Sequence, residues 1–238
     1  MMFGYEKEFD SDNNLKKYEH LARMLYALKL RFGIDDIDSV AAEALTDNSG
    51  DCKCDLIYID DDTGTAVIAQ SYEREQQNRA KSPKTKKATD LNTAIGWILG
   101  RDLHVLPIAV KSASEQLRNA INDGKIGVIY CWFVHNAKYS EEIDNEMLTV
   151  RETGHAVLSK CFPNSGIQVH AEQINDSLIE EMFQNKNSKV LVKDTIELEL
   201  PYSTFEISGS RWSACQASRT YGICHENAAF TRRQRKGK

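Results

Sequence analysis

The sequence predicts an α/β fold, a mixed β-sheet flanked by helices, and three observations carry this prediction. First, residues 54–59 and 65–69 are short apolar runs separated by a turn cluster at residues 60–64, which is typical of a β-hairpin. Second, residues 126–134 (IGVIYCWFV) are nearly all apolar and rich in β-branched and aromatic side chains, as in a strand buried on both faces. Third, segments with helical periodicity alternate with the predicted strands, and such alternation is typical of α/β layers.

Two helices are predicted before the hairpin. Residues 1–14 are polar, and we expect them to form a flexible N-terminus. Residues 15–32 carry apolar side chains at helical spacing, and Gly33 is a residue type that ends helices. A shorter helix is predicted over residues 36–45, and a turn at residues 48–51 then leads into the hairpin.

After the hairpin the chain alternates between helices and strands. Residues 73–83 are polar and predict a loop. The elements expected beyond this loop are a helix at 85–100, a short apolar run at 104–110, a helix at 112–122 begun by Ser112 or Ser114, the strand at 126–134, a helix at 141–161, a strand at 166–171, a helix at 176–183 and a half-exposed strand at 189–200.

The domain organisation follows from these elements. Residues 15–205 are predicted to form one α/β domain, and residues 206–238 an irregular tail. The last part of the chain has no clear period and ends in RRQRKGK, which is typical of a solvated basic end.

Composition narrows the classes of function. The net charge is −5 over 238 residues, which weighs against a protein that coats nucleic acid non-specifically but leaves room for a local basic groove. No apolar run has the length of a membrane span and no signal peptide is visible, so we expect a cytoplasmic protein. The sequence has no Walker loop and no G-x-G-x-x-G, which argues against nucleotide hydrolysis and dinucleotide binding.

Two polar residues interrupt the apolar runs of the hairpin. Asp55 lies near the start of the first run and Gln70 directly follows the second, at positions where apolar side chains would pack more easily. A buried carboxylate is unfavourable unless it is paired or binds a metal. The two side chains could face one cleft and hold a metal; the other interpretation is that Asp55 caps backbone groups at the start of a strand.

This arrangement resembles the core of the PD-(D/E)xK, restriction-endonuclease-like nucleases. In that pattern an Asp and an acidic residue or Gln on adjacent strands hold a divalent metal, and a Lys two residues later positions the attacking water. The segments 50–55 and 68–71 also resemble the N-terminal domain of the abortive-infection phage-resistance (AIPR) proteins, which show a Gly/Asp-rich turn, an Asp-led strand and a strand ending in Gln-Ser-Lys. The resemblance covers residues 15–205 in element order, and its specific part is the hairpin.

The resemblance implies a restriction-endonuclease-like mixed sheet and Mg²⁺-dependent or Mn²⁺-dependent hydrolysis of phosphodiester bonds. Asp55 and Gln70 would bind the metal, with Glu43 from the preceding helix as a further ligand. DNA or RNA would be the partner, and Lys86 and Lys87 would contact its backbone at a helix start. A homodimer is compatible with the resemblance.

The sequence departs from the pattern at Tyr72, which stands where the motif has Lys. A Tyr hydroxyl is neutral at pH 7 and cannot supply the fixed positive charge of Lys. Two functions therefore stay open: a metal-dependent nuclease-like domain of a phage-defence protein, or a catalytically inactive module that binds nucleic acid or protein. AIPR-like chains are longer, so we also expect a truncated or naturally short form.

Overall fold

The computed structural model describes residues 3–46, 52–75, 79, 81, 83, 85–187, 202–207 and 210–215. The chain divides into two compact units, Met1–Lys186 and Asn187–Lys238. In the second unit the described residues form an antiparallel pair of strands, β5 (Tyr202–Ile207) and β6 (Ser210–Cys215). The expected domain end at residue 205 therefore falls within a strand, and the strand expected at residues 189–200 lies outside the described residues.

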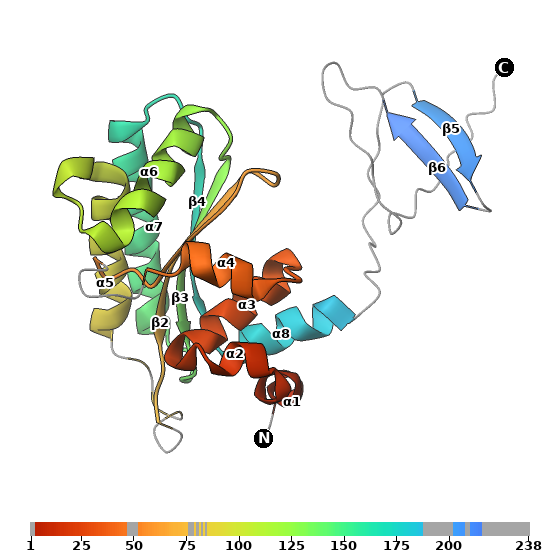
Figure 1. Ribbon diagram of the computed structural model, residues 1–238, viewed down its shortest axis with the longest axis horizontal. Coiled ribbons are helices and arrows are strands. Elements are labelled where there is room, and N and C mark those ends of the chain that lie inside the picture. Colours follow the sequence, from red (N-terminus) through yellow and green to blue (C-terminus); the bar gives the residue numbers. More distant parts are fainter. Residues whose placement is uncertain are drawn as a thin grey trace. The chain divides into compact units, whose positions relative to one another are not determined.

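A four-stranded mixed sheet forms the centre of the first unit (Figure 1). Its strands, in spatial order, are β1 (Leu56–Asp60), β2 (Thr65–Tyr72), β3 (Val128–His135) and β4 (Gln168–Ile174). β1 runs antiparallel to β2, and β2, β3 and β4 run parallel to one another. The predicted α/β class and mixed sheet are confirmed.

The hairpin between β1 and β2 closes through its own polar residues. Asp60 Oδ1 accepts hydrogen bonds from the backbone N–H groups of Asp62 (3.0 Å) and Thr63 (3.1 Å). Gly64 has a φ of 67°, a left-handed conformation in which a residue with a Cβ would be strained. The turn predicted at residues 60–64 is thus confirmed, and its Asp cluster is a solvated turn.

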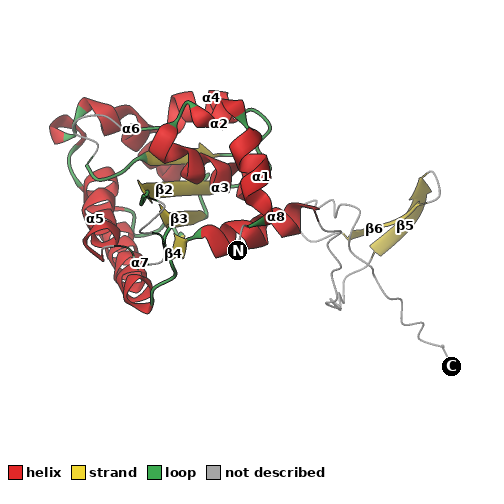
Figure 2. Cartoon of the chain, turned by 90° about the horizontal axis from the view of Figure 1, so that it is seen from below, coloured by secondary structure: helices red, strands yellow, loops and turns green. Residues whose placement is uncertain are grey.

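Helices cover both faces of the sheet (Figure 2). The helices are α1 (Gly4–Ser11), α2 (Asn13–Lys16), η1 (Glu19–Leu21), α3 (Ala22–Phe32), α4 (Ile37–Ala44), α5 (Thr85–Ile95), η3 (Gly96–Gly100), η4 (Leu103–Val105), α6 (Ile108–Asn122), α7 (Glu141–Cys161) and α8 (Asp176–Asn187). α5, α6 and α7 pack on one face, and α1, α3, α4 and α8 pack on the other. None of the helices in the described residues is both long enough and apolar enough to span a bilayer.

The alternation of side chains along the central strands explains the two cores. On β3, Cys131 and Phe133 point to the face covered by α5 and α7, whereas Trp132 and Val134 point to the face covered by α3. All four are at most 1 % exposed. The prediction of a strand buried on both faces is confirmed for β3.

The expectation of a flexible N-terminus is corrected by α1 and α2. Tyr5 is fully buried, and its ring stacks on Tyr26 of α3 at a centroid distance of 5.8 Å. Phe9, one turn further along α1, meets the same Tyr26 ring at 5.4 Å. The aromatic residues at a four-residue spacing were a signal of an amphipathic helix, which the polar composition of the segment obscured.

Two predicted helices have different boundaries. The helix expected at residues 15–32 is interrupted between α2 and α3. Glu19, the first residue of η1, has a φ of 49°, and Tyr18 donates a hydrogen bond to Asp38 of α4 (2.9 Å). α6 begins at Ile108 rather than at Ser112, because Pro107 occupies its N-cap position. Pro favours helix starts, since its φ is fixed near the helical value and it has no N–H to leave unpaired.

Gly154 of α7 is held by close packing on β4. An added Cβ would lie 2.9 Å from Cγ1 of Val169, a stiff and buried side chain. We therefore expect Gly154→Ala to destabilise the fold by about 1 kcal/mol, although Ala is normally better than Gly in a helix by about 1 kcal/mol. Urea denaturation measures the change. Gly96→Ala is the matched control because its Cβ would meet nothing within 4 Å. Equal effects of the two substitutions would contradict this prediction.

Candidate functional site

The hairpin brings Asp55 and Gln70 together. The backbone N–H of Asp55 donates to the carbonyl of Ala69 (2.9 Å), and Asp55 Oδ2 accepts a hydrogen bond from the N–H of Ser71 (2.6 Å). These two contacts bracket Gln70, so the two predicted ligands lie opposite each other at the end of the β1–β2 ladder. Both are buried, with 8 % and 3 % of their surface exposed.

The carboxylate of Asp55 extends the ladder beyond the first residue of β1. Its Oδ2 occupies the place of a backbone acceptor for Ser71. A short hydrogen bond from an N–H to an ionised carboxylate is charge-assisted and stronger than one to a neutral acceptor. One oxygen of Asp55 therefore has the backbone-capping role that the sequence left open, and this role is compatible with a second role for the carboxylate.

The amide of Gln70 has an unusual environment. Within the described part of the chain, its buried Oε1 has no hydrogen-bond partner. A buried acceptor without a partner destabilises a fold by about 1–3 kcal/mol, so such atoms are rare. By strand alternation Gln70 lies on the face of Ile68 and Tyr72, beneath α5 and α7. The position therefore offers a buried amide oxygen that could act as a ligand.

Tyr72, at the position of the motif Lys, lies in an aromatic cluster. Its ring stacks on Phe133 of β3 at a centroid distance of 6.2 Å and an angle of 19°. The guanidinium carbon of Arg74 lies 5.8 Å from the centre of the Tyr72 ring. The guanidinium of Arg74 thus lies beside Tyr72, the residue that stands where the motif has a lysine. The sequence analysis did not identify Arg74.

The other predicted residues lie at the surface. Glu43 is exposed on α4, whose residues Ala41 and Ala44 pack into the core on the α3 side of the sheet. Lys86 is exposed and Lys87 partly exposed in the first turn of α5. In the described residues no group of three or more His, Cys, Asp or Glu side chains is arranged to hold a metal.

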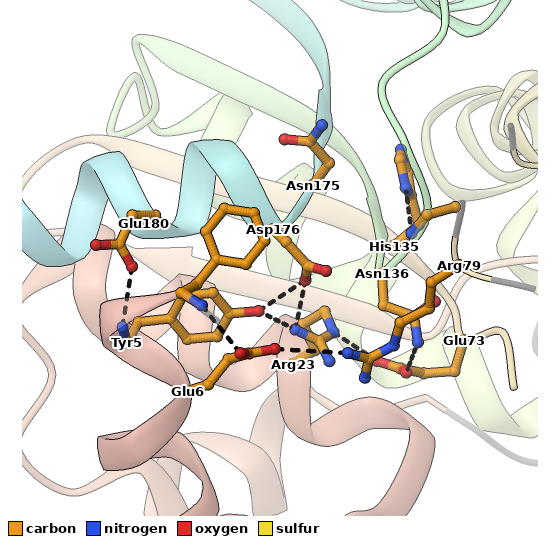
Figure 3. Close-up of polar contacts among 12 residues, drawn as sticks. Tyr5, Glu6, Arg23, Glu73, Arg79, His135, Asn136, Asn175, Asp176 and Glu180 are labelled. Carbon is orange, nitrogen blue, oxygen red and sulfur yellow. Dashed lines mark hydrogen bonds and ion pairs between the residues drawn. The ribbon is translucent and has the colours of Figure 1, made fainter. Parts of the chain in front are cut away.

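A buried network of charges at the carboxyl ends of the parallel strands was missed by the sequence analysis (Figure 3). Arg23 of α3, with a side chain only 4 % exposed, donates through Nε to Glu73 Oε1 (2.7 Å) and through Nη1 to Asp176 Oδ1 (2.6 Å). Tyr5 Oη donates to the same oxygen of Asp176 (2.7 Å) and accepts from Arg23 Nη1. Burial opposes the charge of Arg23, but its anionic partners raise its pKa, so it stays protonated.

Asn136 connects this network to the segment after β2. Its Nδ2 donates to Glu73 Oε2 (2.6 Å) and to the carbonyl of Arg74 (2.8 Å), and its Oδ1 accepts from the N–H of Arg74 (2.7 Å). Both backbone polar groups of Arg74 are therefore fixed. Glu73 was expected to be a loop charge, and its ion pair corrects that interpretation.

The sequence contained a signal for this network. Glu73, Asn136 and Asp176 each follow β2, β3 or β4 by one or two residues. The carboxyl ends of parallel strands meet at one edge of a sheet, so polar residues at these positions come together. The position of Arg23 could not be predicted, because it depends on how α3 packs across the sheet.

His135, the last residue of β3, lies next to Tyr72 in the sheet register. It is fully buried; its Nδ1 accepts from the N–H of Ala137 (3.2 Å), and its Nε2 lies 3.3 Å from Gln173 Oε1. Burial lowers the pKa of His135 to about 4, although these two hydrogen bonds oppose the shift. The imidazole is therefore neutral near pH 7, with its proton on Nε2, and has a structural role.

A comparison of the chain with protein-family models, curated proteins and solved structures gives no match.

Proposed function

We propose that the α/β unit is a divalent-metal-dependent nuclease-like domain of the phage-defence class that the hairpin resembles. The observation that carries the proposal is the buried Oε1 of Gln70, which has no hydrogen-bond partner in the described residues and lies opposite Asp55. A buried polar atom without a partner calls for an explanation, and a bound ion is one of the explanations. The phage-defence class rests on the resemblance of the hairpin alone.

A hard divalent cation fits these two residues. Mg²⁺ prefers oxygen ligands and often takes only one or two protein carboxylates, filling its other positions with water and phosphate oxygens. Asp55 would supply a carboxylate oxygen and Gln70 its amide oxygen. Because Gln is uncharged, the affinity should be weaker than for a pair of carboxylates. Glu43, the further ligand that the resemblance implies, is exposed on α4, which packs on the α3 side of the sheet.

The proposed reaction is hydrolysis of a phosphodiester in DNA or RNA. When bound, the cation neutralises charge on the phosphate and lowers the pKa of a water molecule. The water oxygen forms a bond to phosphorus, and the bond from phosphorus to one sugar oxygen breaks. The water releases a proton to solvent, and the departing sugar oxygen takes one up. Asp55 and Gln70 would orient the reacting groups, with Asp55 kept in place by the N–H of Ser71.

Gln70→Met separates function from stability. The substitution conserves volume and replaces the unpaired oxygen by an apolar atom, so we expect it to stabilise the fold by about 1 kcal/mol. We expect the same variant to lose Mg²⁺-dependent or Mn²⁺-dependent cleavage. The measurements are urea denaturation of the metal-free protein and cleavage of plasmid DNA and single-stranded RNA.

Two further variants make this test specific. Asp55→Asn keeps an acceptor for the N–H of Ser71 but removes the charge, so it should fold and fail to cleave. Asp62→Asn changes an exposed carboxylate in the hairpin turn and should cleave like the wild type. Cleavage that survives in both Gln70→Met and Asp55→Asn would remove the catalytic assignment.

The alternative is a catalytically inactive module that binds nucleic acid or a protein partner. The observation in its favour is Tyr72, whose ring packs on Phe133 at the position of the motif Lys. If Tyr72→Lys creates or raises cleavage, the hairpin is a lapsed nuclease site. If it has no effect while oligonucleotide binding persists, the binding module is the better description.

A further inference from the structure

The residues after β2 place a cation beside the Tyr72 ring. Gln70, Tyr72 and Arg74 follow one another at two-residue spacing, the period at which side chains of an extended chain point to one side. The intervening Glu73 reaches away to Arg23, whereas the guanidinium of Arg74 lies over the Tyr72 ring. Each residue of a strand advances the chain by about 3.3 Å, so Tyr72 lies roughly 7 Å beyond Gln70, and this distance is within the length of an arginine side chain.

Asn136 holds the backbone of Arg74, and the Tyr72 ring lies against its guanidinium. Asn136 binds both the N–H and the carbonyl of Arg74. Asn136 is itself fixed by Glu73, which the buried Arg23 holds in turn. The Tyr72 ring, stacked on Phe133, forms a flat surface on which a guanidinium packs favourably. A cation fixed in this way loses little conformational entropy when it meets a ligand.

We propose that Arg74, supported by the ring of Tyr72, is the phosphate-binding cation of the site and takes over the electrostatic role of the motif lysine. This inference rests on the proposed function. A guanidinium remains charged at every physiological pH and presents parallel N–H donors that match two oxygens of a phosphate. Its contribution is to stabilise negative charge on the phosphoryl group as the phosphorus–oxygen bond breaks. It takes up no proton.

The construction explains the tyrosine. A lysine at residue 72 would carry its own charge, but a tyrosine there supplies a ring for the arginine two residues later. The ring supports Arg74 and the hydroxyl contributes little, so Tyr72→Phe should lose much less activity than Tyr72→Leu. Tyr72→Leu removes the flat surface and should reduce the effect of Arg74.

Cleavage and binding test the inference separately. Cleavage of plasmid DNA and single-stranded RNA with Mn²⁺ is measured for Arg74→Gln, Tyr72→Phe and Tyr72→Leu. Arg74→Gln is expected to reduce the cleavage rate by about 100-fold, as for loss of one charge-stabilising group. Tyr72→Leu is expected to reduce it about tenfold and Tyr72→Phe less than threefold, consistent with a stacking contribution of about 1 kcal/mol or more.

The binding measurement needs no metal. Fluorescence anisotropy of a labelled oligonucleotide in EDTA should show weaker binding by Arg74→Gln and a salt-dependence slope smaller by about one unit. Arg101→Gln is the matched control, since Arg101 also lies over an aromatic ring, that of Trp97, at 5.4 Å. It should match the wild type in both measurements.

Each outcome bears on the inference. If the wild type cleaves or binds and Arg74→Gln behaves like Arg101→Gln, the role of Arg74 is wrong while the proposed function stands. If binding in EDTA depends on Arg74 but no metal-dependent cleavage occurs, the phosphate-binding role is upheld and the nuclease assignment fails. If the wild type neither cleaves nor binds an oligonucleotide, both are overturned.

Discussion

Arg23→Ala is expected to destabilise the α/β unit by about 3–5 kcal/mol, because it leaves the buried Asp176 and the partly buried Glu73 without their cation. Glu73 and Asp176 both bind Arg23, and their side chains are 27 % and 12 % exposed. A buried charge without a partner is far less favourable than a buried pair. For a domain of this size the loss corresponds to a fall of roughly 6–20 °C in melting temperature.

Urea denaturation at pH 7 measures this effect. Arg151→Ala is the matched control, because Arg151 is an exposed arginine of α7 and its loss should change stability by no more than about 0.5 kcal/mol. Asp176→Asn in the Arg23→Ala background removes one of the stranded charges and should restore part of the loss. If Arg23→Ala and Arg151→Ala have equal stability, the ion network contributes nothing to the fold. Arg23→Lys, which keeps the charge, serves if Arg23→Ala does not fold.

Acidification is expected to destabilise the protein through His135. The pKa of His135 is about 4 in the folded chain, below the value near 6.5 of an exposed histidine, because burial disfavours the imidazolium. Between these two values the unfolded chain binds a proton that the folded chain does not. The contribution of His135 to stability is therefore complete above about pH 6.5 and is lost as the pH falls toward 4. The full loss is about 3 kcal/mol.

Comparing the wild type with His135→Gln separates the contribution of His135 to the pH dependence of stability from that of the carboxylates. Unfolding free energies of the wild type and His135→Gln are measured by urea denaturation at pH 7.5, 5.5 and 4.5. The gap between them should narrow as the pH falls, because the variant has no imidazole to protonate. His155→Gln, at an exposed position of α7, should follow the wild type at every pH. A gap that stays constant from pH 7.5 to 4.5 would show that His135 does not titrate in this way.

The sequence predicts the strands of the sheet better than it predicts the packing and the boundaries of the helices. The hairpin and β3 are recognisable because their apolar runs are bounded by Asp and Gly turn residues, and these are local signals. The docking of α1 depends on Tyr5 reaching Tyr26 and Asp176, which no local pattern specifies. The start of α6 was locally encoded by Pro107, but the serines that follow gave a competing cap signal.

Some residues of the candidate site could be predicted from local sequence, and others could not. Asp55 and Gln70 could be paired from the hairpin alone, since strand pairing brings residues at its open end together. Arg74 could not be assigned, because its position depends on Asn136, 62 residues further along the chain. Burial of Arg23 was equally invisible, since an arginine in an amphipathic helix is expected at the surface.

The contact between Tyr5 and Asp176 also has a consequence for the order of folding. It joins residues 171 positions apart, and the Arg23–Asp176 pair joins residues 153 apart. Closing loops of this length loses chain entropy before any contact is gained, so such pairs form late, after the hairpin and the local helices. Substitutions in the network should then accelerate unfolding much more than they slow refolding. The lifetime of the native state should therefore depend on the contacts between α1 and α8.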